Sequence, residues 1–160
     1  MERVMKFDDT DQFILESLVK NGRQKFLEIA RKLRITGGAV HARVNKYKRE
    51  NVLEGFSAKL NIHALGYDVV SFIGVSLIKN SDYQDVSKKL SAIPEILEIH
   101  YTTGNYSLFL KVLAKNMKDF HRILYERIQK LDEVEHTETI LSLDVPLERT
   151  LPSPLFGHGE

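Results

Sequence analysis

The stretch RQKFLEIARKLRITGGAVHARVNKYKR, residues 23–49, predicts two short helices joined by a tight turn. Apolar residues recur at helical spacing in each half; they are Phe26, Ile29, Ala30 and Leu33, then Val40, Val44 and Tyr47. Thr36 suits the N-cap of the later helix, whereas Lys25 is a poor cap for the earlier one. A preceding helix, capped by Asp8 and ended by Gly22, completes a helix-turn-helix unit.

The later helix of this unit places a polar, basic face opposite its apolar stripe. At about 100° per residue, the residues that point away from the stripe are Gly38, Ala42, Asn45, Lys46 and Arg49. Asparagine can make two hydrogen bonds with adenine, alanine can touch the thymine methyl group, and lysine and arginine can reach guanine or phosphates. The helix is therefore predicted to enter the major groove of double-stranded DNA.

Residues beside this face are predicted to contact the DNA backbone. His41 and Arg43 lie on its flanks and suit phosphate contacts. Thr36 and the free amides of Gly37 and Gly38 form a helix N-terminus, which is a natural phosphate site. The alternative interpretation of this helix is a solvated basic face in a small bundle that binds no DNA.

The charge of the chain is divided unevenly, although its net charge is only +1. Residues 1–60 hold 13 Lys and Arg against 8 Asp and Glu, and residues 61–160 hold 10 against 14. A basic half joined to an acidic half suggests that the first half meets a polyanion. The sequence has no cysteine, no apolar run long enough to span a membrane and no signal peptide, so a cytoplasmic protein is expected.

After residue 52 the apolar pattern indicates strands alternating with helices. Strands are expected over residues 67–78, 96–103, 106–114 and 134–145, and helices over 83–93 and 117–131. Gly104 and Asn105 predict a hairpin turn between the middle strands. This order is the β-α-β-β-α-β of a ferredoxin-like unit, so the chain is expected to be α+β. The expected parts are a helix-turn-helix domain (1–52), a linker strand (53–66, with the strand at 53–60), the ferredoxin-like domain (67–146) and a C-terminal tail (147–160).

The first strand of the ferredoxin-like unit is apolar on both faces. Helices cover only one face of such a sheet, so the other face needs a partner. A second copy of the chain is the simplest one. A dimer would also present two reading helices, which suits a palindromic DNA site.

Several runs of the sequence resemble the Lrp/AsnC (feast/famine) transcriptional regulators. The resemblance rests on FDDTDQFILESLVKNGRQKFLEIARKLRIT, on VHARVNKYKRENVLEGFSAKLN with HALGY, and on YTTGNYSLFLKV, and it covers about residues 7–146. It implies a winged-helix type of helix-turn-helix joined to a ligand-sensing ferredoxin-like domain. It also implies dimers that assemble further into tetramers or octamers, and an amino acid or similar small effector bound between dimers.

The resemblance implies an effector site near the turn that contains Gly104. The residues assigned to it are Thr102, Thr103, Gly104, Asn105, Tyr106, Ser107, Thr137 and Thr139. Bound effector is expected to change the spacing of the paired reading helices or the size of the assembly, and so to change which half-sites are engaged together.

The sequence departs from the family pattern in five places. Arg34 stands where the turn usually has glycine, so a left-handed conformation there is expected to carry strain. Gly37 replaces a frequent proline, and Asn51 replaces a glycine that follows the reading helix. Asn105 and Ser107 replace two acidic residues, and a serine offers the α-ammonium group of an amino acid only a hydroxyl. An amino acid is therefore expected to bind weakly, to bind differently, or not to be the ligand.

Two other functions stay open at this point. Asn105 and Ser107 also suit an architectural DNA binder that needs no ligand. Proteins that resemble this family include siroheme decarboxylases, and His100, Tyr101 and His121 would be the suspects for such an enzyme. No histidine motif for a metal and no nucleotide-binding motif occurs, so neither catalysis nor a metal or other cofactor is expected.

Overall fold

The computed structural model describes residues 6–149 and residue 151. The chain forms two compact units, which divide between Lys59 and Leu60, within the predicted linker; Glu148 groups with the first unit. The predicted tail lies mostly outside the described residues.

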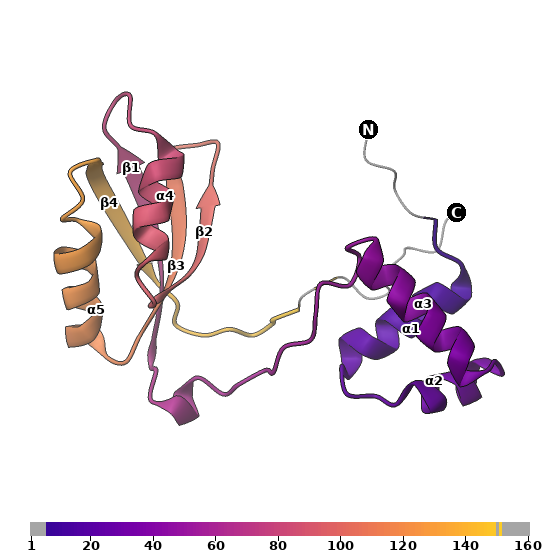
Figure 1. Cartoon of the computed structure of the whole chain (residues 1–160). Coiled ribbons are helices and arrows are strands. Elements are labelled where there is room, and N and C mark those ends of the chain that lie inside the picture. The colour runs from indigo at the N-terminus through magenta and orange to yellow at the C-terminus, as the bar shows by residue number, and fades with distance from the viewer. Residues whose placement is uncertain (1–5, 150, 152–160) are drawn as a thin grey trace. The chain divides into compact units, whose positions relative to one another are not determined.

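The first unit is a bundle of three helices, α1 (Asp9–Lys20), α2 (Phe26–Leu33) and α3 (Gly37–Arg49) (Figure 1). Every apolar residue assigned to α3 is buried in one core, which consists of Ile14, Leu15, Leu18, Ile29, Ala30, Val40, Val44 and Tyr47. Asp8 caps α1 as predicted, and its carboxylate accepts the amide of Asp11 at 2.7 Å. Gly22 lies directly after the cap of α1, where the helix was expected to end, but it does not adopt the left-handed conformation. The cap is Asn21, in an extended conformation, and the ring of Phe56 packs where a side chain on Gly22 would lie.

The turn between α2 and α3 confirms the expected left-handed residue. Arg34 has φ 56° and ψ 39°, and its neighbour Ile35 donates its amide to the carbonyl of Ala30 at 3.0 Å. Thr36 then caps α3 by accepting the amide of Ala39 at 3.1 Å. The cap of α2 is Lys25, which makes no side-chain capping bond.

The predicted strand at residues 53–60 is not a strand in the single chain. Leu53 donates its amide to the carbonyl of Tyr47 at 3.1 Å and packs on the three-helix core, but residues 54–60 pair with no other strand in the part of the chain that the structure describes. Residues 6–59 contain no hairpin of the kind that forms a wing. A short 3₁₀ turn, η1 (His63–Leu65), ends at Gly66 with φ 82° and leads into the second unit.

The second unit is a four-stranded antiparallel sheet with helices on one face (Figure 1). The elements along the chain are β1 (Val69–Leu77), α4 (Tyr83–Ser91), β2 (Ile96–Tyr101), β3 (Leu108–Ala114), α5 (Met117–Ile123), a π-helical turn η2 (Leu124–Ile128) and β4 (Val134–Leu141). The strand order β2-β3-β1-β4 has the two strands that follow helices at its edges. The α+β ferredoxin-like fold was therefore predicted correctly.

The two faces of the sheet differ in what covers them. The face under α4 and α5 is buried at its centre, with Ile73, Val75, Leu108, Leu110, Val112 and Ala114 against the helices. The opposite face, called the open face below, carries Phe72, Gly74, Phe109, Glu138 and Ile140, which pair across the strands. Phe72 and Phe109 stack on it at 5.8 Å between ring centroids. Neither helix of the unit covers this face.

The connection between β2 and β3 is longer than predicted. Tyr101 pairs with Leu108, so six residues, 102–107, form the turn, and neither Gly104 nor Asn105 has a positive φ. A two-residue hairpin turn of the predicted type needs positive φ. Here the turn closes differently, because Thr102 donates its hydroxyl to the carbonyl of Tyr106 at 2.7 Å.

Candidate nucleic-acid interface and ligand site

The exposed side of α3 carries most of the residues predicted to contact DNA. Val40, Val44 and Tyr47 are at most 1% exposed, which fixes the inner side of the helix. The exposed residues are Thr36, Gly38, His41, Ala42, Asn45, Lys46 and Arg49. Gly37 is half-buried. The helix thus presents one amide, one methyl group and several cations to solvent.

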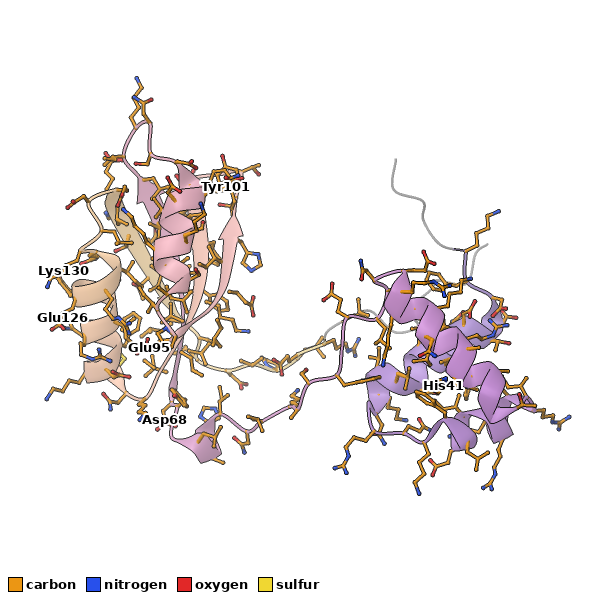
Figure 2. The ribbon with its side chains drawn as sticks, viewed as in Figure 1. His41, Asp68, Glu95, Tyr101, Glu126 and Lys130 are labelled. Carbon is orange, nitrogen blue, oxygen red and sulfur yellow. The ribbon has the colours of Figure 1, made fainter. Side chains whose placement is uncertain are left out.

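Two side chains on this exposed side are held in place by neighbours. Asn45 donates from Nδ2 to Nδ1 of His41 at 3.1 Å. The ring of His41, labelled in Figure 2, meets Phe26 of α2 edge-on at 5.9 Å between centroids. Because the hydrogen bond uses only one of the amide N–H groups of Asn45, its other N–H and its carbonyl oxygen can still bond to a base edge.

Arg49 is the most accessible arginine near the end of α3. Its side chain is 72% exposed, and its only ion pair within the described residues is with the adjacent Glu50, at 3.5 Å. Such an exposed pair is weak, so it does not compete strongly with a phosphate. The N-terminus of α3 has the free backbone amides that an anion site requires. Thr36 caps the amide of Ala39, and the amides of Gly37 and Gly38 lie before the intrahelical ladder begins.

Arg43 differs from the other cations of α3, because carboxylates of α1 hold it. Its Nη1 lies 2.9 Å from both oxygens of Asp8 and 2.5 Å from Oδ1 of Asp11. The same Asp11 oxygen accepts the hydroxyl of Tyr47 at 2.5 Å. Burial by itself would raise the pKa of Asp11, but the bonds from Tyr47, the Asp8 amide and Arg43 together hold that pKa below its ordinary value. Burial and the bond to Asp11 raise the pKa of Tyr47.

The turn at residues 102–107 bonds back to the end of β1. Ser107 donates its amide to the carbonyl of Val75 at 2.9 Å, and its hydroxyl accepts the amide of Leu77 at 3.4 Å. Ser76 donates its hydroxyl to the carbonyl of Asn105 at 3.4 Å. The hydroxyl of Ser107 therefore already has a donor within the protein. Tyr101, which precedes the turn (Figure 2), stacks on Tyr83 at 4.0 Å between centroids.

Tyr106 leaves the turn and lies on the open face. Its ring covers Gly74 so closely that a Cβ there would come within 2.6 Å of ring atoms. Its hydroxyl donates to the carboxylate of Glu138, and this bond raises the pKa of Tyr106. The ring of Tyr106 can therefore lie here only because position 74 is a glycine and has no Cβ. Glu138 was not among the predicted residues, although alternation from Thr137 and Thr139 placed it on the other face.

The eight residues assigned to an effector do not come together in the single chain. Thr137 pairs with Val75 and Thr139 with Ile73, so both lie on the helix-covered face, opposite Tyr106. Thr137 accepts a hydrogen bond from Nε2 of Gln129 at 2.7 Å. It lines a polar hollow with Gln129, Val134, Glu135 and His136. The turn and β4 therefore offer two separate polar surfaces.

The other histidines that the structure describes share no site. On the open face, Nε2 of His100 lies 3.3 Å from Oε2 of Glu98. The ring of His121 stacks on that of Tyr125 in η2, with 4.5 Å between ring centroids. Among the described residues, no three His, Asp or Glu side chains are placed to hold a metal ion. In the same part of the chain, no helix combines the length and the apolar character needed to cross a membrane.

Both units of the chain match known domain models and proteins. Residues 7–48 match an AsnC-type helix-turn-helix domain, and residues 70–152 match the Lrp/AsnC ligand-binding domain. The regulatory protein AsnC of Haemophilus influenzae is 39% identical over 144 residues, which are 90% of this chain and 96% of that protein. AsnC of Escherichia coli K12 is 37% identical over 144 residues, covering 90% and 95%.

Solved structures agree with the architecture described above. The structure of E. coli AsnC superposes with a TM-score of 0.88 at 35% identity and covers 92% of this chain and 99% of that one. A regulator from Neisseria meningitidis in complex with L-Met has a TM-score of 0.84 at 22% identity, covering 92% and 97%, which shows a shared fold. Both domain models, the curated relatives and the fold agree, and the chain belongs to the Lrp/AsnC family of transcriptional regulators.

Proposed function

We propose that α3 reads a specific DNA sequence in the major groove. The observation that carries this proposal is the exposed side of α3, where Asn45 and Ala42 lie between cations while the opposite side is fully buried. Asn45 would bond to adenine and Ala42 would touch a thymine methyl. Lys46, Arg49 and His41 would contact guanine or phosphates, and the N-terminus formed by Thr36, Gly37 and Gly38 would hold a phosphate.

The DNA proposal is tested by binding to a selected duplex over a series of salt concentrations. Asn45→Ala is expected to lose preference for the selected site over random DNA. Arg49→Gln is expected to lower the slope of log affinity against log salt by about 0.9 for each protomer that binds, the value for one phosphate contact, and so by about 1.8 for a dimer on a palindrome. Lys88→Gln is the matched control, because this substitution removes the same charge from the other unit. Lys88 lies on α4, and its side chain is 77% exposed. Equal effects of Arg49→Gln and Lys88→Gln would contradict the proposal.

The open face of the sheet is proposed to pack on a second copy of the chain. It carries the Phe72–Phe109 stack, and Ile140 beside it is 48% exposed. Ile140→Glu is expected to be tolerated in a single chain but to place a charge in the interface, so sedimentation should show monomers. Val19→Glu, at an apolar position 55% exposed on α1, is the control and should remain a dimer. The sedimentation of the wild-type chain also shows whether its dimers assemble into tetramers or octamers.

The second unit is proposed to sense an amino-acid-type effector at the turn 102–107, with Thr137 and Thr139 contributed through the assembly. A relative of the same fold was solved with L-Met, and the matching domain model is a ligand-binding one. The effector would change the spacing of paired α3 helices and so the half-sites they reach. A screen of the common amino acids should find one that raises the melting temperature.

Ser107→Asp sharpens the effector test. Because a carboxylate offers a full charge to an α-ammonium group, this variant should bind the identified amino acid more tightly than wild type. Ser91→Asp, which adds the same charge at the end of α4, is the control. No shift with any amino acid, for either protein, would favour the ligand-independent DNA binder instead.

The relatives are named transcriptional regulators, and a role without catalysis is proposed for this chain as well. No cofactor is needed for the proposed mechanism. A regulator of chromosomal DNA works in the compartment that holds the DNA, so the proposed location is the cytoplasm.

A further inference from the structure

The charge of Arg43 is neutralised inside the three-helix unit. Within the described residues, all of its hydrogen bonds pass through Nη1, which lies 2.9 Å from both oxygens of Asp8 and 2.5 Å from Asp11. Only 34% of its side chain is exposed, compared with 72% for Arg49 on the same helix. A guanidinium that already has two carboxylates gains little from approaching a phosphate.

Asp11 holds α3 at two points. Its Oδ1 accepts from Arg43 and from the hydroxyl of Tyr47, both at 2.5 Å, and these residues lie about one turn apart on α3. Its Oδ2 accepts the amide of Asp8 at 3.1 Å, so the carboxylate is itself fixed by the N-terminal cap of α1. The apolar contacts of Val40 and Val44 are not directional, whereas these hydrogen bonds are. They therefore fix the rotation of α3 about its own axis.

Rotation matters because base recognition depends on short distances. A helix has an outer radius of about 5–6 Å, so a rotation of roughly 20° moves the tip of a side chain by about 2 Å. Such a shift exceeds the tolerance of a hydrogen bond between Asn45 and a base. Phosphate contacts by long, exposed lysine and arginine side chains tolerate it better, because these side chains are flexible.

We propose that Asp11 and Arg43 are positioning residues for sequence-specific DNA recognition: they hold α3 at the rotation that presents Asn45 and Ala42 to base edges, and Arg43 does not itself contact DNA. This inference rests on the proposed reading of DNA by α3. The alternative is that the exposed part of Arg43 contacts a phosphate directly. The two assignments predict affinity changes of opposite sign for the loss of the Asp11 charge. They also predict different salt dependences of DNA binding for the loss of the Arg43 charge.

The experiment measures affinity for the selected palindrome and for random duplex DNA over a salt series, with the full chain. Arg43→Gln is expected to lower affinity for the palindrome roughly tenfold, in the range of one lost base contact. It should leave the salt slope unchanged and lower the affinity for random DNA by less than Arg49→Gln does. Arg49→Gln is the matched control, since it removes the same charge from α3, and should lower the slope by about 0.9 per protomer, which is about 1.8 for a dimer on the palindrome.

Asp11→Asn gives the sharper result. Removing a negative charge from a DNA-binding unit strengthens binding if only electrostatics act. Positioning predicts the opposite for the palindrome, which Asp11→Asn should bind more weakly than wild type does, while random DNA is bound at least as tightly as by wild type. Tyr47→Phe alters no charge and keeps the size of the side chain, so it serves if Asp11→Asn does not fold. Tyr47→Phe should lose affinity for the palindrome and keep its affinity for random DNA. Circular dichroism at the assay temperature shows whether each variant is folded.

The inference is overturned if Arg43→Gln lowers the salt slope by about one phosphate contact per protomer, or if Asp11→Asn and Tyr47→Phe bind the palindrome as well as wild type or better. Partial unfolding would weaken binding to both kinds of DNA in proportion, so it does not imitate a loss confined to the palindrome. If wild type itself prefers no sequence, the proposed function fails, and that result is seen before any variant is compared.

Discussion

Replacing Arg34 by glycine should stabilise the three-helix unit. Arg34 has φ 56° and ψ 39°, a conformation that costs a residue with a Cβ roughly 1–2 kcal/mol. Glycine removes this cost, but it also gives the unfolded chain more freedom, which offsets about 0.4–1 kcal/mol. The side chain of Arg34 is exposed and makes no hydrogen bond or ion pair within the described residues, so little else is lost. The expected net gain is about 0.5–1 kcal/mol.

Calorimetry of the full chain can detect this gain. For a unit of this size the gain corresponds to a rise of about 2–8 °C in melting temperature. Val44→Ala, a large-to-small change at a position 1% exposed, identifies which transition belongs to the three-helix unit. Arg34→Ala is the matched control, because it removes the guanidinium but keeps the Cβ and the strain. If Arg34→Gly melts no higher than Arg34→Ala, backbone strain at this turn is not the reason for the difference.

Two further changes test other parts of the structure. Gly74→Ala should destabilise the sheet unit by about 1–3 kcal/mol in urea, because the new Cβ would lie 2.6–2.7 Å from ring atoms of Tyr106. Adding Tyr106→Ala should restore most of the loss, and a double variant as unstable as the single one would argue against the clash. The pKa of Asp11 is lower in the folded chain than its ordinary value of 3.8, so its bonds stabilise the fold above about pH 4, and this contribution is lost as the pH falls through the folded-state pKa. The stability difference between wild type and Asp11→Asn, measured in urea, should therefore shrink from pH 5 to pH 3, and a constant difference would count against the assignment.

The helices and their faces were predictable because local patterns determine them. The spacing of Val40, Val44 and Tyr47 correctly gave the buried side of α3, and the cap at Thr36 gave its start. The left-handed Arg34 was expected because its place in the turn was recognised. The strands of the sheet were also found, since their β-branched and aromatic runs are bounded by clear turn residues.

The features that were missed depend on contacts distant in sequence. Asp11 and Arg43 lie 32 residues apart, and periodicity indicates only that Arg43 is beside the stripe, not which carboxylate it meets. The length of the turn at 102–107 depends on bonds from Ser107 to β1, which no local pattern contains. The expected strand at 53–60 is not formed because a strand needs a partner, and none of the described segments pairs with it.

The most direct test of the account is selection of random duplex DNA by the purified wild-type chain, with Asn45→Ala/Arg49→Ala selected in parallel. Wild type should enrich a palindrome whose half-sites are separated by about one helical turn or a multiple of it, as two α3 helices of a dimer require. The variant should enrich nothing while still binding random DNA weakly at low salt. Recovery of no motif by wild type, or of the same motif by both proteins, would contradict the reading of DNA by α3.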